Sequence, residues 1–157
     1  NRRFFMQNIA SDIQEVNDRH RTHNSGGGEH LLFFLIDIDH FKSINDNYGH
    51  AAGDLVLTQM SSVLQQVFRQ TDYLIRWGGE EFIIVCPETP LAEGVQLAEK
   101  LRLTAEAADF PIVRKQTASL GVAFFTAPES LAQLISRVDA ALYQAKKSGR
   151  NRVVQSS

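Results

Sequence analysis

Acidic residues adjoin two apolar segments of this 157-residue sequence, and their spacing suggests metal chemistry. Asp37 and Asp39 stand one residue apart after the apolar run 31–36, and Glu80 and Glu81 precede a second apolar run. Carboxylates at neighbouring strand ends repel one another unless a cation or a proton lies between them. The sequence therefore predicts a divalent-metal site that acts on phosphate groups. The alternative is that these acids are ordinary solvated residues at strand ends.

Oxygen ligands for such an ion can be assigned from the same residues. Magnesium keeps several waters, so one or two protein carboxylates and substrate phosphates are sufficient. Asp37 and Glu80 are the candidate ligands, one from each strand end, and the backbone carbonyl of Ile38 is near enough to join them. Magnesium would offset phosphate charge and lower the pKa of an attacking hydroxyl group, whose proton Glu80 or Glu81 would accept.

Basic residues that can hold phosphates lie in two places. Lys42 follows the first pair of acids, and Lys146 and Arg150 lie in the segment 145–151. Such cations, together with backbone N–H groups at a helix start, can bind a triphosphate. The same segment also has the composition of a helix C-terminus, with Gly149 as its cap. The two interpretations are compatible.

Asn45 and Asp54 have the chemistry to recognise guanine. Guanine presents neighbouring N1–H and N2–H₂ donors that one carboxylate can accept, whereas adenine presents an acceptor at N1. Asp54 suits that role, and Asn45 can complete the base edge with its amide. Alternatively, Asp54 is the N-cap of a following helix and Asn45 is a turn residue. The residues alone leave both interpretations open.

Four helices are predicted to position these groups, because apolar residues recur at helical spacing. The third helix begins near Pro90, whose fixed φ suits a first helical turn. Residues 22–29, which contain three glycines, are expected to form a loop. The apolar faces of the four helices are Phe5, Ile9, Ile13 and Val16; Leu57, Met60, Leu64, Val67 and Phe68; Leu91, Val95, Ala98, Leu101 and Ala105; and Leu131, Leu134, Ile135, Val138, Leu142 and Ala145.

The strands predict the fold class. The continuous apolar run 31–36 suits a central strand covered on both faces. Residues 73–86 form a hairpin, because Gly78–Gly79 permits the positive φ angles of a two-residue turn. Residues 118–125 form another strand, and 152–155 a short final one. Because the central pair is a hairpin, we expect an α+β fold with a mixed, mostly antiparallel sheet and helices packed on it.

Composition excludes several classes of protein. The hydrophobic content of 43% suits one globular domain, and the net charge of -2 with mixed signs gives no indication of a nucleic-acid or membrane surface. Cys86 lies in an apolar run and is expected to be a buried core residue. We find neither a signal peptide nor an apolar stretch long enough to span a bilayer, so a cytoplasmic location is expected.

Taken together, the motifs resemble the GGDEF family, the diguanylate cyclases. The chain has Glu rather than Asp at the third signature position, a variant that the family uses freely. The resemblance implies that two GTP molecules are joined into cyclic di-GMP with release of two pyrophosphates. It also implies a palm-like fold with a ferredoxin-like core, as in nucleotide cyclases. The motifs span 37–46, Gly49–His50, Gly53–Asp54, 76–82, 119–122 and 143–146.

The resemblance assigns roles to individual positions. It implies two Mg²⁺ ions per active site, with Mn²⁺ as an alternative, and a preference for GTP because Asp54 is present. Glu80 is the candidate base that activates the 3′-hydroxyl, with Glu81 in support. The implied metal ligands are Asp37, the Ile38 carbonyl and Glu80, the guanine contacts are Asn45, His50 and Asp54, and the phosphate contacts are Lys42, Lys146 and Arg150.

A further motif concerns regulation. Arg69 and Asp72 begin and end the segment 69–72, which five residues separate from Gly78, as in the inhibitory RxxD site at which the family binds its product. By the resemblance, Arg69 stacks on one guanine of cyclic di-GMP, and Asp72 accepts hydrogen bonds from another guanine. Without the resemblance, the two residues would be a helix-end ion pair worth a few tenths of a kcal/mol.

The resemblance also implies the partners. Residues 1–157 are expected to be a single GGDEF catalytic domain, the C-terminal output module of a larger protein with an N-terminal sensory domain. The cytoplasmic portion of a membrane-anchored receptor is one form that such a protein takes. The family usually has an Asp-x-Leu-Thr-x-Leu stretch before Asn1, so the N-terminal edge is expected to be truncated. Each site holds one GTP, so catalysis requires a head-to-head homodimer. No nucleic-acid partner and no direct membrane contact are expected.

Three other functions compete with this interpretation. The first is a catalytically silent receptor for cyclic di-GMP or GTP that binds through Arg69 and Asp72. Such proteins usually lose the acidic signature, which is intact here at Asp37, Glu80 and Glu81. The second is a class III cyclase that makes a 3′,5′-cyclic mononucleotide. A purely structural scaffold is the third, and nothing in folding requires this cluster of acids and bases.

Overall fold

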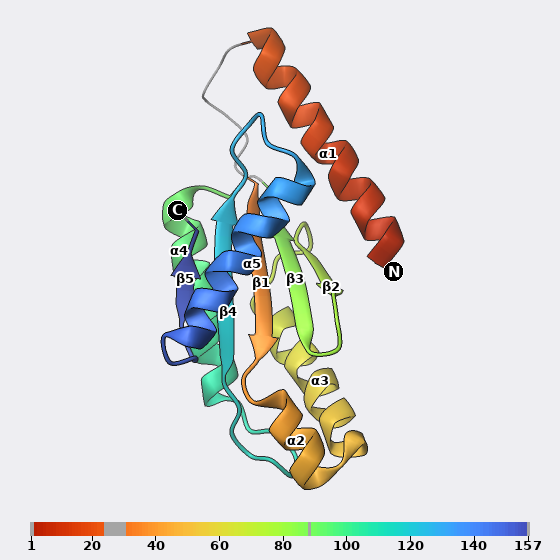
Figure 1. Ribbon diagram of the computed structural model, residues 1–157, viewed down its shortest axis with the longest axis vertical. Coiled ribbons are helices and arrows are strands. Elements are labelled where there is room, and N and C mark those ends of the chain that lie inside the picture. Colours follow the sequence, from red (N-terminus) through yellow and green to blue (C-terminus); the bar gives the residue numbers. More distant parts are fainter. Residues whose placement is uncertain (1, 24–30, 88, 157) are drawn as a thin grey trace.

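A five-stranded sheet forms the centre of the computed structural model, which describes residues 2–23, 31–87 and 89–156 (Figure 1). The central strand pairs antiparallel with a neighbour on each side, and only the last strand is parallel to its neighbour. The prediction of a mixed, mostly antiparallel sheet is therefore confirmed. In spatial order, the strands are β2 (Tyr73–Arg76), β3 (Glu81–Cys86), β1 (Leu32–Ile38), β4 (Ala118–Phe124) and β5 (Val153–Gln155).

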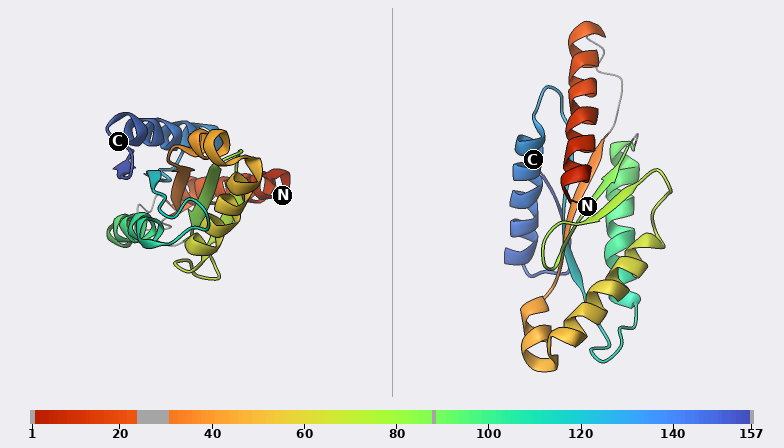
Figure 2. Two further views of the ribbon diagram at one scale, coloured as in Figure 1. Left: turned by 90° about the horizontal axis from the view of Figure 1, so that it is seen from below. Right: turned by 90° about the vertical axis from the view of Figure 1, so that its right-hand side faces the viewer.

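Helices cover both faces of the sheet. α5 lies on one face, and α3 and α4 lie on the other (Figure 2). α1 contributes its apolar side chains to the core on the α5 side. The helices are α1 (Arg2–His23), α2 (Phe41–Tyr48), α3 (His50–Gln65), α4 (Leu91–Ala107) and α5 (Leu131–Lys147). None of the helices in the described part of the chain is long and apolar enough to cross a membrane.

Two apolar cores explain the continuous hydrophobic run of β1. Side chains alternate between the faces of a strand. Leu32, Phe34 and Ile36 accordingly pack toward α3 and α4, while Phe33 and Leu35 pack toward α1 and α5. All seven residues of β1 are buried. β1 begins one residue later than the apolar run and ends two residues beyond it, so that it includes Asp37 and Ile38.

α2 is an element that the periodicity did not predict, and it changes the interpretation of the residues after it. α2 ends at Gly49, whose φ of 89° suits glycine, and α3 begins at His50. Asp54 therefore lies inside α3, so its interpretation as an N-cap is wrong. Asn45 lies within α2 and is not a turn residue. Val67 and Phe68 follow the end of α3, although both still pack against the core.

The hairpin is confirmed, but its turn differs from the prediction. Four residues, 77–80, connect β2 to β3, and neither Gly78 nor Gly79 has a positive φ. The Trp77 N–H donates to the Glu81 carbonyl over 2.8 Å, and the Arg76 guanidinium donates to the carbonyls of Gly78 and Gly79. Arg76 thus stabilises a wider loop, and the left-handed turn is not required.

The remaining predicted helices and strands agree with the structure apart from their ends. α4 follows Pro90, although Val95 lies on its exposed side, with 40% of its surface accessible. Cys86 is buried in β3, as expected. Of the loop predicted over 22–29, the first two residues belong to α1, and 24–29 lie outside the described residues.

Candidate functional site

A pocket of about 410 Å³ lies where β1 ends and α2 begins. Antiparallel pairing brings the end of β1 beside the start of β3, and Asp37 stands opposite Glu81 in the register. The last turn of α5 and the residues after it supply the basic side. Six predicted site residues line this pocket together, namely Asp37, Ile38, Lys42, Glu80, Lys146 and Arg150.

Asp37 is the buried acid of the pocket. It is 3% exposed, and Lys146 forms a short ion pair with its Oδ2 atom. Burial raises the pKa of Asp37 to about 6, and Glu80 and Glu81 add to the rise, while Lys146 opposes it. A carboxylate with a raised pKa gains from a nearby positive charge. The position of Asp37 therefore favours a bound cation.

Glu80 and the backbone of Ile38 complete the oxygen-rich side. The Ile38 N–H donates to the Glu80 carbonyl over 3.3 Å, which joins the end of β1 to the loop before β3. The side chains of Glu80 and Glu81 are both half-buried. Because Glu81 lies in β3 and Glu80 in the preceding loop, only Glu80 lines the pocket.

This donor set fits a magnesium ion. Among the described residues, no group of three or more His, Cys, Asp or Glu side chains is arranged to hold a metal alone. Magnesium does not need such a group, because one or two carboxylates with water and substrate phosphates satisfy it. Asp37, Glu80 and the Ile38 carbonyl offer hard oxygen atoms beside the buried charge, which is the chemistry that this ion prefers.

The basic residues of the pocket come from two helix ends. Lys42 lies in the first turn of α2, and Lys146 in the last turn of α5. Arg150 follows α5, and Gly149 precedes it with a φ of 129°. The expected helix C-terminus is therefore present, and its basic residues also line the pocket. The helix C-terminus is confirmed, and phosphate binding by Lys146 and Arg150 stays a prediction.

The residues predicted to contact guanine lie on the neighbouring helix pair and do not line this pocket. Asn45 is half-buried in α2, and His50 and Asp54 are exposed on α3. The two helices approach closely where Asn45 meets Gly53, since a Cβ atom on Gly53 would lie 1.9 Å from the Asn45 Oδ1 atom. Gly53 is thus required for Asn45 to lie beside the start of α3.

Asp39 plays a part that the sequence did not indicate. It is 3% exposed, and its carboxylate accepts hydrogen bonds from Thr117 Oγ1 at 2.7 Å, Ser119 Oγ at 2.6 Å and the Asn151 N–H at 3.0 Å. Ser119 lies in β4, Thr117 directly precedes that strand, and Asn151 follows α5. Its partners are far apart in sequence, so spacing alone could not have revealed them.

Arg69 and Asp72 lie apart from the pocket, in the connection between α3 and β2. The Asp72 side chain is 1% exposed and accepts from the backbone N–H and the guanidinium of Arg69. The Arg69 Nη2 atom also donates to Thr89 Oγ1 over 2.7 Å. Arg69 itself is half exposed, so its outer face is accessible to a ligand.

With this geometry established, the comparisons identify the family. Residues 1–152 match the family described as diguanylate cyclase, GGDEF domain, and the chain belongs to it. Diguanylate cyclase DgcM of Escherichia coli K12 is 46% identical over 120 residues, which are 76% of this chain and 29% of the relative. The chain therefore spans less than a third of that protein.

Solved structures share the fold over nearly the whole chain. The active GGEEF domain of a diguanylate cyclase from Vibrio cholerae has a TM-score of 0.81 and 32% identity, with 96% of each chain covered. The GGDEF domain of DgcB from Caulobacter crescentus, solved in complex with c-di-GMP, has a TM-score of 0.78 and 31% identity, with coverage of 93% and 89%. The predicted palm-like fold is therefore confirmed.

Proposed function

We propose that residues 1–157 form one catalytic domain that condenses two GTP molecules into cyclic di-GMP and two pyrophosphates. The observation that carries the proposal is the pocket at the end of β1, where acidic oxygens face basic side chains. The acidic oxygens suit a divalent cation, and the basic side chains suit the phosphates of a nucleoside triphosphate. Membership of the diguanylate cyclase family supports the same reaction.

The acidic side of the pocket supplies the metal ligands and the base in this proposal. Asp37, Glu80 and the Ile38 carbonyl would hold the metal, which, when bound, offsets phosphate charge and makes the attacking hydroxyl more acidic. Glu80 accepts the proton of the 3′-hydroxyl, supported by Glu81. The 3′-oxygen then bonds to the α-phosphorus of the second GTP, and the bond to the β-phosphate breaks to release pyrophosphate.

The remaining residues bind the substrate in the proposed reaction. Lys42, Lys146 and Arg150 hold the phosphates and neutralise their charge. Lys146 would exchange its contact with Asp37 for one with a phosphate when the metal binds, because the cation then pairs with that carboxylate. Asn45 and Asp54, with His50 nearby, would recognise guanine from α2 and α3. Two domains must meet head to head, since each holds one GTP.

Mass spectrometry of the product tests the proposal. Concentrated, nucleotide-stripped protein is incubated with GTP and magnesium beside a Glu80→Ala variant of equal thermal stability. Cyclic di-GMP from the unmodified protein, and none from the variant, is the expected result. A 3′,5′-cyclic mononucleotide, or no product at any protein concentration, would overturn it.

We further propose that Arg69 and Asp72 bind cyclic di-GMP and thereby inhibit the enzyme. The exposed face of Arg69 is free to stack on guanine, while the buried Asp72 carboxylate orients the guanidinium. Asp72 can accept from a ligand only if Arg69 shifts, since three donor atoms of Arg69 already occupy it.

Arg69→Ala should retain catalysis and weaken inhibition, measured as the concentration of added cyclic di-GMP that halves the initial rate. Unchanged inhibition in that variant would refute this site.

A further inference from the structure

The segment that carries Arg150 into the pocket has an unusual backbone. Arg150 and Asn151 are consecutive non-glycine residues in the left-handed region, with φ angles of 63° and 45°. Such a conformation is unfavourable for a residue with a side chain and persists only where its surroundings hold it. The Arg150 N–H donates to the Ala145 carbonyl over 2.9 Å, which satisfies the end of α5. That bond fixes where the segment begins but leaves the conformation of Asn151 to be explained.

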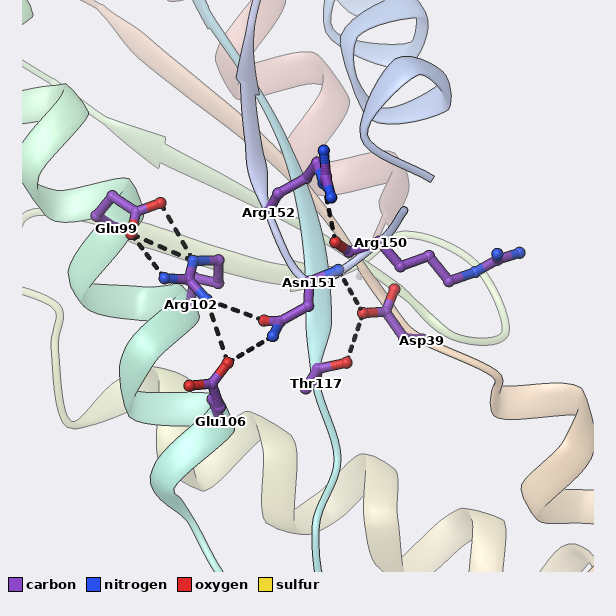
Figure 3. A network of polar contacts seen from close by, with 8 residues as sticks. All are labelled: Asp39, Glu99, Arg102, Glu106, Thr117, Arg150, Asn151 and Arg152. Atoms are coloured by element: carbon purple, nitrogen blue, oxygen red, sulfur yellow. Dashed lines mark hydrogen bonds and ion pairs between the residues drawn. The ribbon is translucent and has the colours of Figure 1, made fainter. Parts of the chain in front are cut away.

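Asn151 is held from two sides of the molecule, as Figure 3 shows. Its backbone N–H donates to the Asp39 Oδ2 atom over 3.0 Å, at the end of β1. Its side-chain Oδ1 atom accepts from Arg102 Nη1 over 3.0 Å, and its Nδ2 atom donates to Glu106 Oε2, both on α4. Arg102 is in turn held by the carboxylates of Glu99 and Glu106. The amide of Asn151 therefore uses both its donor and its acceptor.

Asp39 lines the pocket beside Asp37, and its carboxylate also holds a backbone group. Its buried carboxylate accepts from two hydroxyl groups, of Thr117 and Ser119, besides the Asn151 N–H. A hydrogen bond from a backbone N–H to a carboxylate is stronger than one between neutral groups, and more so where water is excluded. Asp39 thus fixes the position of Asn151 relative to β1, two residues from Asp37.

The side chain of Arg150 extends away from the α4 residues of this network. In Figure 3, Arg102 and Glu106 lie on one side of the backbone at Asn151, and the Arg150 guanidinium points to the other side, where Asp39 also lies. Arg150 lines the pocket with Asp37 and Lys146, whereas Asn151 does not line it. The Arg152 Nε atom donates to the Arg150 carbonyl over 3.0 Å and fixes the peptide group that follows Arg150.

We propose that Asn151, held by Asp39 and by Arg102 and Glu106, is a positioning residue that places the Arg150 guanidinium for phosphate binding. The inference rests on the proposed function, because it takes Arg150 as a phosphate contact. Asn151 touches no substrate itself. Its effect on binding passes through Arg150, and this dependence distinguishes positioning from a general contribution to stability.

The test is a double-mutant cycle measured by calorimetric binding. The ligand is a GTP analogue with a methylene group between the α- and β-phosphorus atoms, in a buffer that contains magnesium. Four proteins are compared: the unmodified chain, Asn151→Gly, Arg150→Ala and the double variant. Glycine keeps access to the left-handed region but removes the side-chain bonds. Asn151→Gly should weaken binding by about fivefold, and should weaken it less than about twofold when Arg150 is already alanine.

Arg114→Gly is the matched control. The backbone of Arg114 is also in the left-handed region, with a φ of 67°, and Arg114 lies outside both the network and the pocket. Its replacement should leave analogue binding within about twofold of the unmodified chain, because no network bond is lost. If the thermal unfolding curve of Asn151→Gly shows that this variant does not fold, Arg102→Met on α4 replaces it. The same loss of analogue binding is expected, with the same dependence on Arg150.

The possible outcomes separate the two proposals. Failure of the unmodified protein to bind the analogue would overturn the proposed function, and this inference with it. Binding by the unmodified protein and equal binding by Asn151→Gly would overturn only the inference. A loss of binding that is as large in the Arg150→Ala background as in the unmodified chain would also overturn it, because Asn151 would then act independently of Arg150.

Discussion

Asp37 and Asp39 are identical residues two positions apart, and their surroundings give them different properties. Both are 3% exposed. Asp37 faces Lys146 and two other acids, and its pKa is raised to about 6, so it favours a cation. Asp39 also lines the pocket, but its carboxylate accepts three hydrogen bonds from uncharged groups of the fold. Asp37 is therefore the candidate for cation binding, whereas Asp39 holds the surrounding segments together.

A similar buried polar contact fixes the loop before α5. The Arg137 guanidinium bonds both carboxylate oxygens of Glu129 and also donates to the Phe124 carbonyl over 2.6 Å. The side chain of Glu129 is only 12% exposed. Arg137→Met should lower the free energy of unfolding by about 1–3 kcal/mol, because the buried carboxylate and carbonyl lose their partner. Urea denaturation followed by circular dichroism measures this.

An exposed ion pair supplies the control for that variant. The Lys115 Nζ and Asp109 Oδ1 atoms are 2.9 Å apart, but the two side chains are 61% and 86% exposed. Lys115→Met should change the free energy of unfolding by less than about 0.5 kcal/mol, since solvent screens such pairs. Equal losses in the two variants would show that burial does not determine the contribution of Arg137.

At the scale of elements, the packing of α5 on β4 depends on one glycine. A Cβ atom on Gly121 would lie 2.4 Å from the Val138 carbonyl oxygen and 2.6 Å from the Leu142 nitrogen. Both are backbone atoms and cannot rotate away. Gly121→Ala should therefore push α5 from the sheet and lower the free energy of unfolding by about 1–3 kcal/mol.

Thermal or urea unfolding of Gly121→Ala should be compared with that of Gly79→Ala. A Cβ atom on Gly79 meets nothing within 4 Å, and its φ is not positive. The second variant should unfold within about 0.5 kcal/mol of the original protein. If Gly121→Ala were equally stable, the close approach of α5 would not limit the size of the residue at that position.

Periodicity predicted the long helices but missed the short helix α2. α3, α4 and α5 each have 16 or 17 residues, enough turns to repeat an apolar face. α2 has eight residues and buries only Phe41 and Ile44, so its pattern is too brief to recognise. The predicted two-residue turn of the hairpin was wrong. The Arg76 side chain donates hydrogen bonds that stabilise a longer loop, which backbone propensities do not predict.

The candidate site was predictable where its residues are neighbours in the sequence. Asp37 and Lys42, and the pair Glu80–Glu81, are recognisable as motifs at strand and helix ends. The contacts of Asn151 with Asp39 and Arg102 join residues 112 and 49 positions apart, and only the fold brings them together. Those contacts required the three-dimensional structure.

At the scale of the whole molecule, each domain contributes one candidate site for GTP, and the proposed reaction requires two. Specific activity should therefore rise with protein concentration until the dimer is saturated, because in the proposed reaction product forms only when two GTP-loaded domains meet. Initial rates of cyclic di-GMP formation across a thousandfold dilution series would measure this. A constant specific activity, together with a monomeric mass in sedimentation at the same concentrations, would contradict the two-domain reaction.

The central position of β1 has a consequence for the order in which the backbone becomes accessible to solvent. β1 is hydrogen-bonded on both sides, and all its residues are buried. Its amide protons should be among the last to exchange with deuterated water, since only global opening exposes them. Asp37 and Ile38 are the last two residues of that strand. The part of the pocket that Asp37 and Ile38 provide is therefore expected to open only together with the core of the sheet.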